Sequence, residues 1–377
     1  MEPATPDWAA LRAEFPALAH WTYLNTATFG QVPRCSIQAI LRHFQRRDEL
    51  ACSDFLQWFD DADRIRLLAA QLIGAQPSDI AFIPNAATAL GLLLGGICWR
   101  PGDRIVTLEH EFPNLIYHPA LLATRGLEFV ETPWERFWDA ITPNTRLVLL
   151  SEVNYITGFR APVADIAPEL RRRGILLFVD GTQSAGALCF DASQVQPDMY
   201  AVHGYKWLLA PNGAGFMYVH PELRARLAPN VIGWRSHRDW RAVDNLHHGA
   251  PVFRCEAEKY EGGMIPFALL YALEASLRLI LGAGVERIEQ RVLGLADRVR
   301  DAVRQAGGRL LSDEAPHYDS PLVAARFPGR SASELARALA SRRVLVSARH
   351  DYLRISPHFY NDESDVARFR EELLRLL

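Results

Sequence analysis

An aspartate and a lysine each follow a short apolar segment of this chain. Residues 175–178 are apolar and lead to Asp180, and the apolar-rich residues 199–202 lead to Lys206. Such short segments are typical of buried parallel strands that deliver a polar group at the carboxyl end. The stretch between them is long enough for one crossover connection. We therefore expect Asp180 and Lys206 to share the rim where α/β sheets place their sites.

A carboxylate and an amine in this arrangement suit the cofactor pyridoxal 5′-phosphate (PLP). PLP needs a lysine to hold its aldehyde as an imine, and a carboxylate to keep its ring nitrogen protonated so that the ring accepts electrons. Each residue alone has a simpler explanation, because charged loop residues are common: Lys206 as a surface lysine and Asp180 as a helix cap. The pair together favours the cofactor.

The motifs around this pair resemble those of a known family. The segments VDGTQSAG, residues 179–186, and HGYKWLLAPNGAGFMYV, residues 203–219, are similar to the class V aminotransferase family of PLP enzymes. That family includes cysteine desulfurases, kynureninase, isopenicillin N epimerase-like proteins and cyst(e)ine C–S lyases. The resemblance implies an α/β fold of the fold type I PLP-dependent transferase kind. Its large domain would have a mostly parallel central sheet, and a smaller α+β domain would follow at the C-terminus.

The resemblance also implies roles for residues inside these motifs. Lys206 would be the Schiff-base lysine, and Asp180 would be the partner of the pyridine nitrogen. Gln183 would donate a hydrogen bond to the phenolic oxygen of the cofactor. His203 would lie at the phosphate, and Tyr205 would also contact the cofactor.

The segment Asn85-Ala86-Ala87-Thr88 opens a run of small and apolar residues that we expect to be helical. A helix N-terminus presents unpaired N–H groups and a positive dipole end, which suit a phosphate dianion. Asn85 is a good N-cap residue, a role that is compatible with phosphate binding. In the family an equivalent Ala-Thr pair holds the PLP phosphate, so the resemblance points to Ala87 and Thr88.

Two further segments are expected beside the cofactor ring. Family members place a flat side chain on the ring within the segment that corresponds to residues 109–113, and the motif spacing favours Phe112 over His110. The alternative for His110 is a hydrogen-bonded loop histidine. The segment after residue 151 resembles one that passes beside the cofactor's O3′, and the sequence leaves open whether Asn154 or Tyr155 makes that contact.

The C-terminal part of the chain carries an expected substrate contact. Residues 353–365 resemble the family's RxS…YNTxED signature, which implies that Arg354 binds the α-carboxylate of an amino acid through a bidentate fork. The alternative is a strand arginine in a surface ion pair. Asn25 is the second residue expected to bind the substrate, because it lies in a segment similar to one that enters the active site in the family. Met264 replaces a family threonine that reaches the phosphate in the partner subunit, so a backbone amide of residues 262–263 would have to substitute.

These roles imply a reaction at the α-carbon of an amino acid, through an external aldimine and a Cα carbanion, with Lys206 as the general base. The same residues serve several outcomes, so the fold does not choose among them. Desulfurases use a small-domain cysteine, and no cysteine follows Cys255. C–S lyase or isopenicillin N epimerase-like chemistry is therefore our first expectation, and aminotransferase activity is the second. A non-catalytic PLP-binding scaffold is a third possibility.

Length and composition set the wider expectations. With 377 residues, the chain exceeds a typical single core. We expect residues 1–20 to pack with the small domain, 21–265 to form the large PLP-binding domain, and 266–377 to form a connecting helix and the small domain. A net charge of −3 gives no reason to expect nucleic acid or an anionic membrane as partner.

The remaining signals are consistent with a cytoplasmic protein. The five cysteines show no disulfide or zinc-like spacing, which suggests reduced thiols. His247-His248 lacks acidic or cysteine companions, so no metal site is expected. The N-terminal residues show no secretory signal pattern. The family resemblance implies a homodimer in which both subunits line each site.

The pattern along the chain also predicts individual elements. Strands are expected at residues 80–84, 104–108, 127–132 and 146–151, and helices at 7–18, 163–173 and 266–281. Asn361 is expected to cap the last helix.

Overall fold

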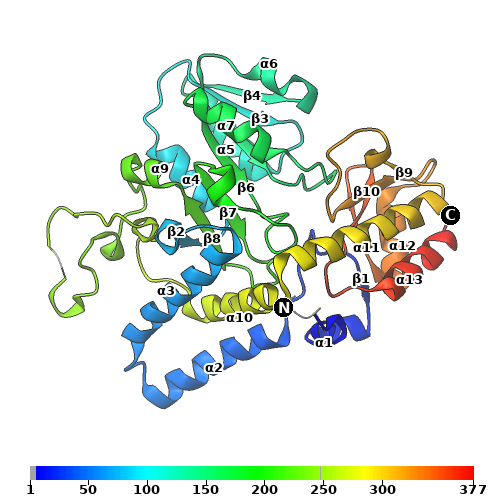
Figure 1. Ribbon diagram of the computed structural model, residues 1–377, viewed down its shortest axis with the longest axis horizontal. Helices are drawn as coiled ribbons and strands as arrows, with labels where there is room; N and C mark the ends of the chain where they lie inside the picture. The colour runs from blue at the N-terminus through cyan, green and yellow to red at the C-terminus, as the bar shows by residue number, and fades with distance from the viewer. Residues whose placement is uncertain (1–5, 247) are drawn as a thin grey trace, which may run out of the picture.

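A seven-stranded sheet forms the centre of the large domain in the computed structural model, which describes residues 6–246 and 248–377 (Figure 1). Its strands are β2 (Ile80–Ile83), β3 (Arg104–Leu108), β4 (Glu128–Thr132), β5 (Thr145–Ser151), β6 (Leu176–Asp180), β7 (Met199–His203) and β8 (Gly215–Val219). The strand order is β2-β8-β7-β6-β5-β3-β4, and β8 runs antiparallel to both neighbours while the other pairs are parallel. The expected mostly parallel sheet is confirmed. His247, considered above as a metal ligand, lies outside the described residues.

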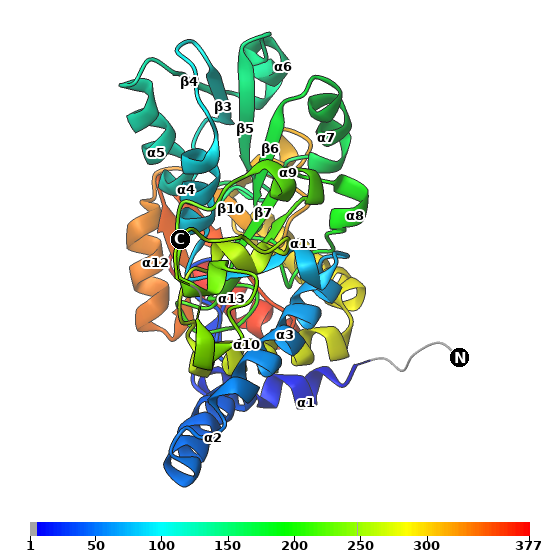
Figure 2. The same cartoon turned by 90° about the vertical axis from the view of Figure 1, so that its left-hand side faces the viewer.

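Both faces of this sheet are buried, which explains the apolar strand segments. Along β5, Val148 and Leu150 face one hydrophobic cluster while Leu147 and Leu149 face the other. Figure 2 shows helices on either side of the sheet, with α4 and α5 opposite α7 and α8. The helices of this domain are α2 (Arg34–Leu50), α3 (Phe55–Leu72), α4 (Ala86–Gly96), α5 (Pro113–Ala123), α6 (Phe137–Ala140), α7 (Val163–Arg172), α8 (Ala192–Val195) and α9 (Pro221–Arg226). The expected connecting helix is α10 (Phe267–Ala283), which shares a hydrophobic cluster with α3.

The C-terminal part of the chain folds around a second, antiparallel sheet. Its strand order is β12-β13-β10-β9, and its strands are β9 (Arg309–Leu310), β10 (Val323–Arg326), β12 (Ser347–Arg349) and β13 (Tyr352–Ile355). The helices α11 (Val285–Gln305), α12 (Ala332–Ser341) and α13 (Glu363–Leu374) share a hydrophobic cluster with these strands. The expected smaller α+β domain is therefore present.

The N-terminal segment contacts the C-terminal residues. The strand β1 (Thr22–Tyr23) pairs in parallel with β11 (Val344–Leu345). In the short helix α1 (Trp8–Ala13), Arg12 pairs with Asp365 at 2.7 Å. These contacts join the two ends of the chain, which are far apart in sequence (Figure 1).

The structure differs from the sequence expectations in three places. The helix expected at residues 7–18 is divided into α1 and a 3₁₀ turn at Pro16–Ala19, because proline begins a new turn. The long helices α2 and α3 were not predicted. The expected cap Asn361 was wrong: Asp362 caps α13, and the Asn361 amide instead donates to the carbonyl of Tyr23.

Within the described ranges, no single helix is both long and apolar enough to cross a membrane; α10 and α11 meet that test only as a pair bent by 81°. The same residues contain no group of three or more histidine, cysteine or acidic side chains that could hold a metal ion. The five cysteines are free thiols.

Candidate active site

One cavity lies at the carboxyl ends of β5, β6 and β7. The strand pairing aligns Ser151 with Asp180, and Asp180 with Ala201, so these three strand ends lie side by side. The chain after β7 then brings Lys206 back to the same place. The residues lining the cavity are Ala86, Phe112, Asn114, Ser151, Tyr155, Asp180, Thr182, Gln183, His203, Tyr205 and Lys206. The structure therefore brings Asp180 and Lys206 together, as the strand pattern predicted.

The Lys206 amine is buried among aromatic side chains. Its Nζ lies 5.6 Å from the centroid of the Phe112 ring and 5.3 Å from that of Tyr205. Burial lowers the pKa of Lys206 to about 7, against the opposing effect of Asp180. The positive charges of Arg354 and Arg349 contribute to this lowering. A large share of the amine is thus neutral and nucleophilic near neutral pH.

Asp180 is a buried carboxylate held by the turn that follows it. The Thr182 backbone N–H donates to Asp180 Oδ1 at 2.8 Å. Burial raises the pKa of Asp180, while the Thr182 hydrogen bonds and the charge of Lys206 lower it. The carboxylate therefore faces the cavity in a low-dielectric setting where it can pair with a cationic nitrogen.

The N-terminus of α4 forms one end of the cavity. Asn85 caps this helix, and its Oδ1 accepts hydrogen bonds from the Thr88 N–H at 2.9 Å and the Thr88 hydroxyl at 3.2 Å. Ala86 lines the cavity, whereas Ala87 is exposed at its edge. In the first turn of this eleven-residue helix the Thr88 N–H is bonded to Asn85, so the N–H groups of Ala86 and Ala87 are the ones placed to meet an anion. Contact of Ala87 and Thr88 with a phosphate stays a prediction.

His203 lies in the same cavity with a neutral imidazole ring. Burial lowers the pKa of His203 to about 4, and the positive charge of Lys206 adds to this. The Gly213 N–H points to its Nε2 at 3.4 Å, and its ring packs 4.3 Å from that of Tyr205. A neutral histidine can donate one hydrogen bond, which suits the predicted place at the phosphate.

Of the two side chains considered for stacking, Phe112 lines the cavity of Lys206. Its ring meets that of Tyr155 edge to face at 5.1 Å, which fixes its orientation. His110 lies instead in a neighbouring cavity, with a left-handed backbone conformation at φ 61°. The geometry therefore favours Phe112 as the stacking residue.

Asn154 and Tyr155 have different surroundings. The side-chain Oδ1 of Asn154 accepts hydrogen bonds from the Ile156 N–H and from both the N–H and the hydroxyl of Thr157, and its Nδ2 donates to the His110 backbone carbonyl. Asn154 thus stabilises its own turn, and Tyr155 is the one that lines the cavity. Of the two alternatives for the O3′ contact, the structure favours Tyr155.

Gln183 is fixed on both sides of its amide. Its Nε2 donates to the Ala27 carbonyl at 3.0 Å, and its Oε1 accepts from Trp207 Nε1 at 2.9 Å. One amide hydrogen remains free to donate into the cavity, as a contact to a phenolic oxygen requires.

Arg354 comes from the small domain and contacts Tyr155, which lines the cavity. It is 1% exposed, and its guanidinium donates to the Tyr155 carbonyl at 2.6 Å, to Thr28 Oγ1 at 2.5 Å and to Ser347 Oγ at 3.1 Å. Burial lowers its pKa to about 9, and Arg349 lowers it further. The surface ion pair considered as an alternative is therefore not observed.

The predicted residue Asn25 acts through Thr28. The Thr28 hydroxyl donates to Asn25 Oδ1 at 2.8 Å and accepts from Arg354. Asn25 thereby helps to place the arginine. Arg349, which also donates to Thr28 Oγ1 at 3.2 Å, was missed in the sequence; it lies five residues before Arg354, ahead of the signature segment.

Glu111 was also missed. It is a buried acid beside the cavity, and Ser151 donates to it at 2.7 Å from the backbone N–H and 2.5 Å from the hydroxyl. Its position directly before Phe112, the expected stacking residue, is the sequence feature that could have identified it.

Met264 is 65% exposed, and it follows a loop in which the Gly262 carbonyl accepts from Arg235 N–H. The proposed backbone contact to a partner's phosphate stays a prediction.

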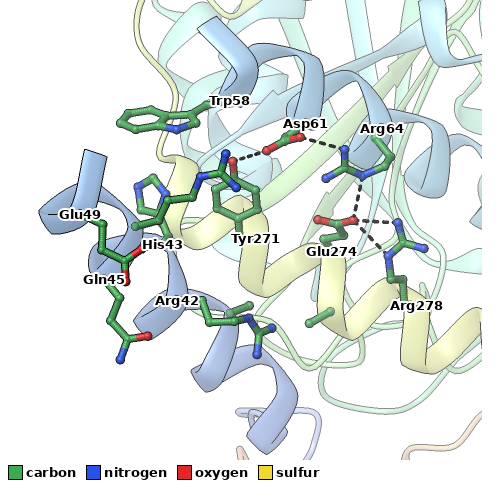
Figure 3. Close-up of a pocket in the computed structure, with 13 residues that line it drawn as sticks. Arg42, His43, Gln45, Glu49, Trp58, Asp61, Arg64, Tyr271, Glu274 and Arg278 are labelled. Atoms are coloured by element: carbon green, nitrogen blue, oxygen red, sulfur yellow. Dashed lines mark hydrogen bonds and ion pairs between the residues drawn. The ribbon is translucent and has the colours of Figure 1, made fainter. Parts of the chain in front are cut away.

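A separate cavity of about 610 Å³ lies between α2, α3 and α10. Figure 3 shows its network, in which Tyr271 donates to Asp61 at 2.6 Å and Arg64 bridges Asp61 and Glu274. Arg278 also pairs with Glu274, at 2.8 Å. These side chains are held in ion pairs, and neither lysine of the sequence lines this cavity.

The residues of the Lys206 cavity fit PLP. They supply a buried amine with a pKa near neutral, a buried carboxylate, a flat ring and a free helix N-terminus. Lys206 would hold the aldehyde carbon, and Asp180 the ring nitrogen. Bound PLP supplies a conjugated ring that accepts electrons from a substrate amino acid. Lys259, the other lysine of the sequence, donates to the Arg224 carbonyl at 2.7 Å and does not line this cavity.

Comparison with known proteins places the chain in a family. Residues 22–369 match the family model for aminotransferase class-V. Isopenicillin N epimerase from Streptomyces clavuligerus is 29% identical over 403 residues, which cover 98% of each chain. A probable cysteine desulfurase from Xylella fastidiosa is 24% identical over 99% of this chain and 96% of its own.

Solved structures show the same similarity. A C-DES mutant with glycine covalently linked to its PLP cofactor superposes with a TM-score of 0.88, at 25% identity over 98% of this chain and 99% of its own. The complex of the cystine C–S lyase C-DES with its reaction product cysteine persulfide gives a TM-score of 0.87, at 25% identity over 96% of this chain and 99% of its own. The expected fold type I architecture is confirmed. With a family model that spans most of its length and a cavity that fits the cofactor, this chain belongs to the aminotransferase class-V family of PLP-dependent enzymes.

Proposed function

We propose that the protein acts on an α-amino acid as a C–S lyase or as an isopenicillin N epimerase-like enzyme. The observation that carries this proposal is the shared cavity of Lys206 and Asp180, in which the pKa of the amine is about 7. Arg354 lies next to this cavity and donates to the backbone carbonyl of Tyr155, a residue that lines it. The similarity to the cystine C–S lyase C-DES and to isopenicillin N epimerase supports these two reactions above others.

The side chains of the site have separate roles in the reaction at the α-carbon. Arg354 binds the substrate carboxylate with a planar fork, which orients the Cα–H bond toward the cavity. The Lys206 amine, once it is free, takes the α-proton at Nζ, because its pKa of about 7 leaves it neutral near physiological pH. Asp180 keeps a positive charge on the ring nitrogen. Phe112 and Tyr155 cover the reacting centre and limit access of water.

The cysteines argue against desulfuration through a protein persulfide. Cys255 is the last cysteine of the chain, and none of the five lines the Lys206 cavity. Expulsion of a thiol by β-elimination needs no protein thiol, and neither does inversion at Cα. Transamination remains the second candidate, because the same lysine can return the proton to a carbon of the cofactor instead of to the α-carbon of the substrate.

The reaction is identified by incubating the PLP-loaded protein with cystine, cysteine and a panel of other amino acids in deuterated water. Pyruvate together with a persulfide or sulfide product indicates the lyase. Inverted configuration with deuterium at Cα indicates the epimerase, and a keto acid that keeps the substrate's carbon skeleton indicates transamination. Failure to convert or deuterate any amino acid would contradict the proposal and favour a PLP-binding scaffold.

We further propose that the protein forms a homodimer. On α2, the apolar side chains of Ile37, Leu41 and Phe44 recur at helical spacing and are 48%, 56% and 48% exposed. Figure 2 shows α2 extending from the body of the molecule. Light scattering should give the mass of two chains, and Leu41→Asp should give one chain. Leu67→Asp on α3, at a similarly exposed position, is the control. A monomeric wild type would contradict the proposal.

A further inference from the structure

The buried carboxyl of Glu111 separates the cofactor cavity from a second cavity. This second cavity has a volume of about 390 Å³, and Glu111 and Ser151 are part of its wall. Ser151 lines the cofactor cavity as well. Glu111 itself is 5% exposed. The pair therefore stands between the catalytic residues and a space that can hold water.

Three hydrogen bonds fix the Glu111 carboxylate. Its Oε1 accepts from the Ser151 N–H at 2.7 Å, and its Oε2 accepts from the Ser151 hydroxyl at 2.5 Å and the Phe112 N–H at 3.2 Å. The carboxylate thus joins the end of β5 to the residue that carries the candidate stacking ring. All three donors are neutral groups.

The charges around Glu111 do not neutralise it. In the described part of the chain, no lysine, arginine or histidine forms an ion pair with it. The titratable groups that interact with it are Asp180 at the end of β6 and Tyr155 in the loop after β5. The titratable groups that share the wall of the second cavity with it are Glu109, His110, Glu135 and Tyr318. The negative charge of Asp180 acts on Glu111, and that of Glu111 acts on Tyr155.

We propose that Glu111 is a positioning residue, which holds Phe112 against the cofactor and places a second negative charge beside Asp180. The inference rests on the proposed cofactor site. A buried carboxyl without a cationic partner is unfavourable for folding. Glu111 therefore does not serve stability, and a role in the cofactor site explains its presence. The negative charge of Glu111 stabilises the protonated, cationic form of groups within the cofactor cavity.

The charge of Glu111 changes near neutral pH. Burial raises its pKa from 4.5 to about 7, the Ser151 and Phe112 hydrogen bonds oppose this, and Asp180 adds to it. Below this pH the carboxyl is neutral, and above it the negative charge is present. Protons can reach it from the second cavity without passing through the catalytic one.

The test is the visible absorption of the PLP-loaded protein, titrated from about pH 5.5 to about pH 9. Glu111→Gln should move the midpoint of the cofactor's titration down by roughly half a pH unit or more, as loss of a nearby unit charge predicts. Glu109→Gln is the matched control, because Glu109 lies two residues away, lines the same second cavity and is exposed. It should keep the wild-type midpoint.

Ser151→Ala provides a second variant if Glu111→Gln does not fold. Loss of the Ser151 hydroxyl raises the pKa of Glu111, so the midpoint should shift in the same direction by a smaller amount. Wild-type midpoints in both variants, or in the one that folds, would overturn the inference. Absence of any visible band in the wild type would instead overturn the cofactor site itself.

Discussion

Asp180 and Lys206 reach one cavity from the ends of two adjacent parallel strands, β6 and β7. Burial pushes both groups toward their neutral forms, and the attraction between their opposite charges resists this. Burial has the largest effect on the lysine, whose pKa falls to about 7, and two arginines from the small domain act in the same direction. The amine is thereby prepared for carbonyl chemistry while a carboxylate remains close by.

The first prediction concerns the pH dependence of cofactor loading. The neutral amine of Lys206 is the nucleophile, so the rate at which apoprotein forms its link to PLP should rise with pH and level off above about 7. Stopped-flow absorbance measures this rate. A rate that keeps rising toward the pKa of an ordinary lysine, about 10.4, would show that the amine is not perturbed.

Asp180→Ala should weaken the binding of PLP. The variant removes the charged partner of the ring nitrogen and one charge-assisted hydrogen bond, worth roughly 1.5–3 kcal/mol, or about tenfold to a hundredfold in affinity. Equilibrium dialysis of the apoprotein with PLP gives the dissociation constant. Asp191→Ala, which removes an N-cap remote from the cavity, is a control that should keep normal affinity. Equal affinities in both variants would contradict the assigned role.

Arg354→Lys should raise the KM for an amino acid substrate strongly, while the affinity for PLP should change little. Lysine keeps the charge but lacks the planar fork, and we expect a loss of roughly tenfold to a hundredfold in kcat/KM for an amino acid substrate. Steady-state kinetics test this, and the unchanged visible spectrum serves as an internal control. Arg342→Lys, in an ion pair with Glu372 on the far side of the small domain, should behave as wild type. An unchanged KM in Arg354→Lys would exclude carboxylate binding at this position.

The stability of the apoprotein should depend on pH through Glu111. The folded carboxyl keeps its proton up to about pH 7, whereas an unfolded one loses it near 4.5, so the folded state binds more protons between these values. Stability therefore falls as pH rises across this window, by at most about 3 kcal/mol from this one group. Glu111→Gln should remove this loss, as urea unfolding at about pH 5 and about pH 8.5 can show. Parallel stability profiles for wild type and variant would contradict it.

The parts of the site that follow from local sequence were predicted well. Short apolar runs ending in a polar residue placed Asp180 and Lys206 at the same sheet edge, because strand length and crossover connections leave few alternatives. The N-cap Asn85 and the start of α4 follow from equally local signals.

The contacts that depend on distant segments could not be predicted in the same way. Thr28 joins Arg354 only because the N-terminal segment pairs with the small domain. Asn154 matches a cofactor-binding motif, yet its amide is used by its own turn. Asn361 has the composition of a helix cap, but Asp362 takes that place one residue later. A hydrogen bond to a distant segment decides the role of Arg354 and of Asn361, whereas the turn that follows Asn154 decides the role of that residue.

Chemical trapping of the cofactor tests the central claim most directly. Lys206 and Lys259 are the two lysines of the sequence, and Lys259 already donates to a backbone carbonyl. Reduction of the imine with borohydride therefore distinguishes between two possible sites of attachment. Peptide mapping of the reduced, PLP-loaded protein should find the pyridoxyl group on Lys206. Lys259→Arg should keep the label, and Lys206→Ala should lose it together with turnover. A label on Lys259, or an active Lys206→Ala variant, would contradict the account.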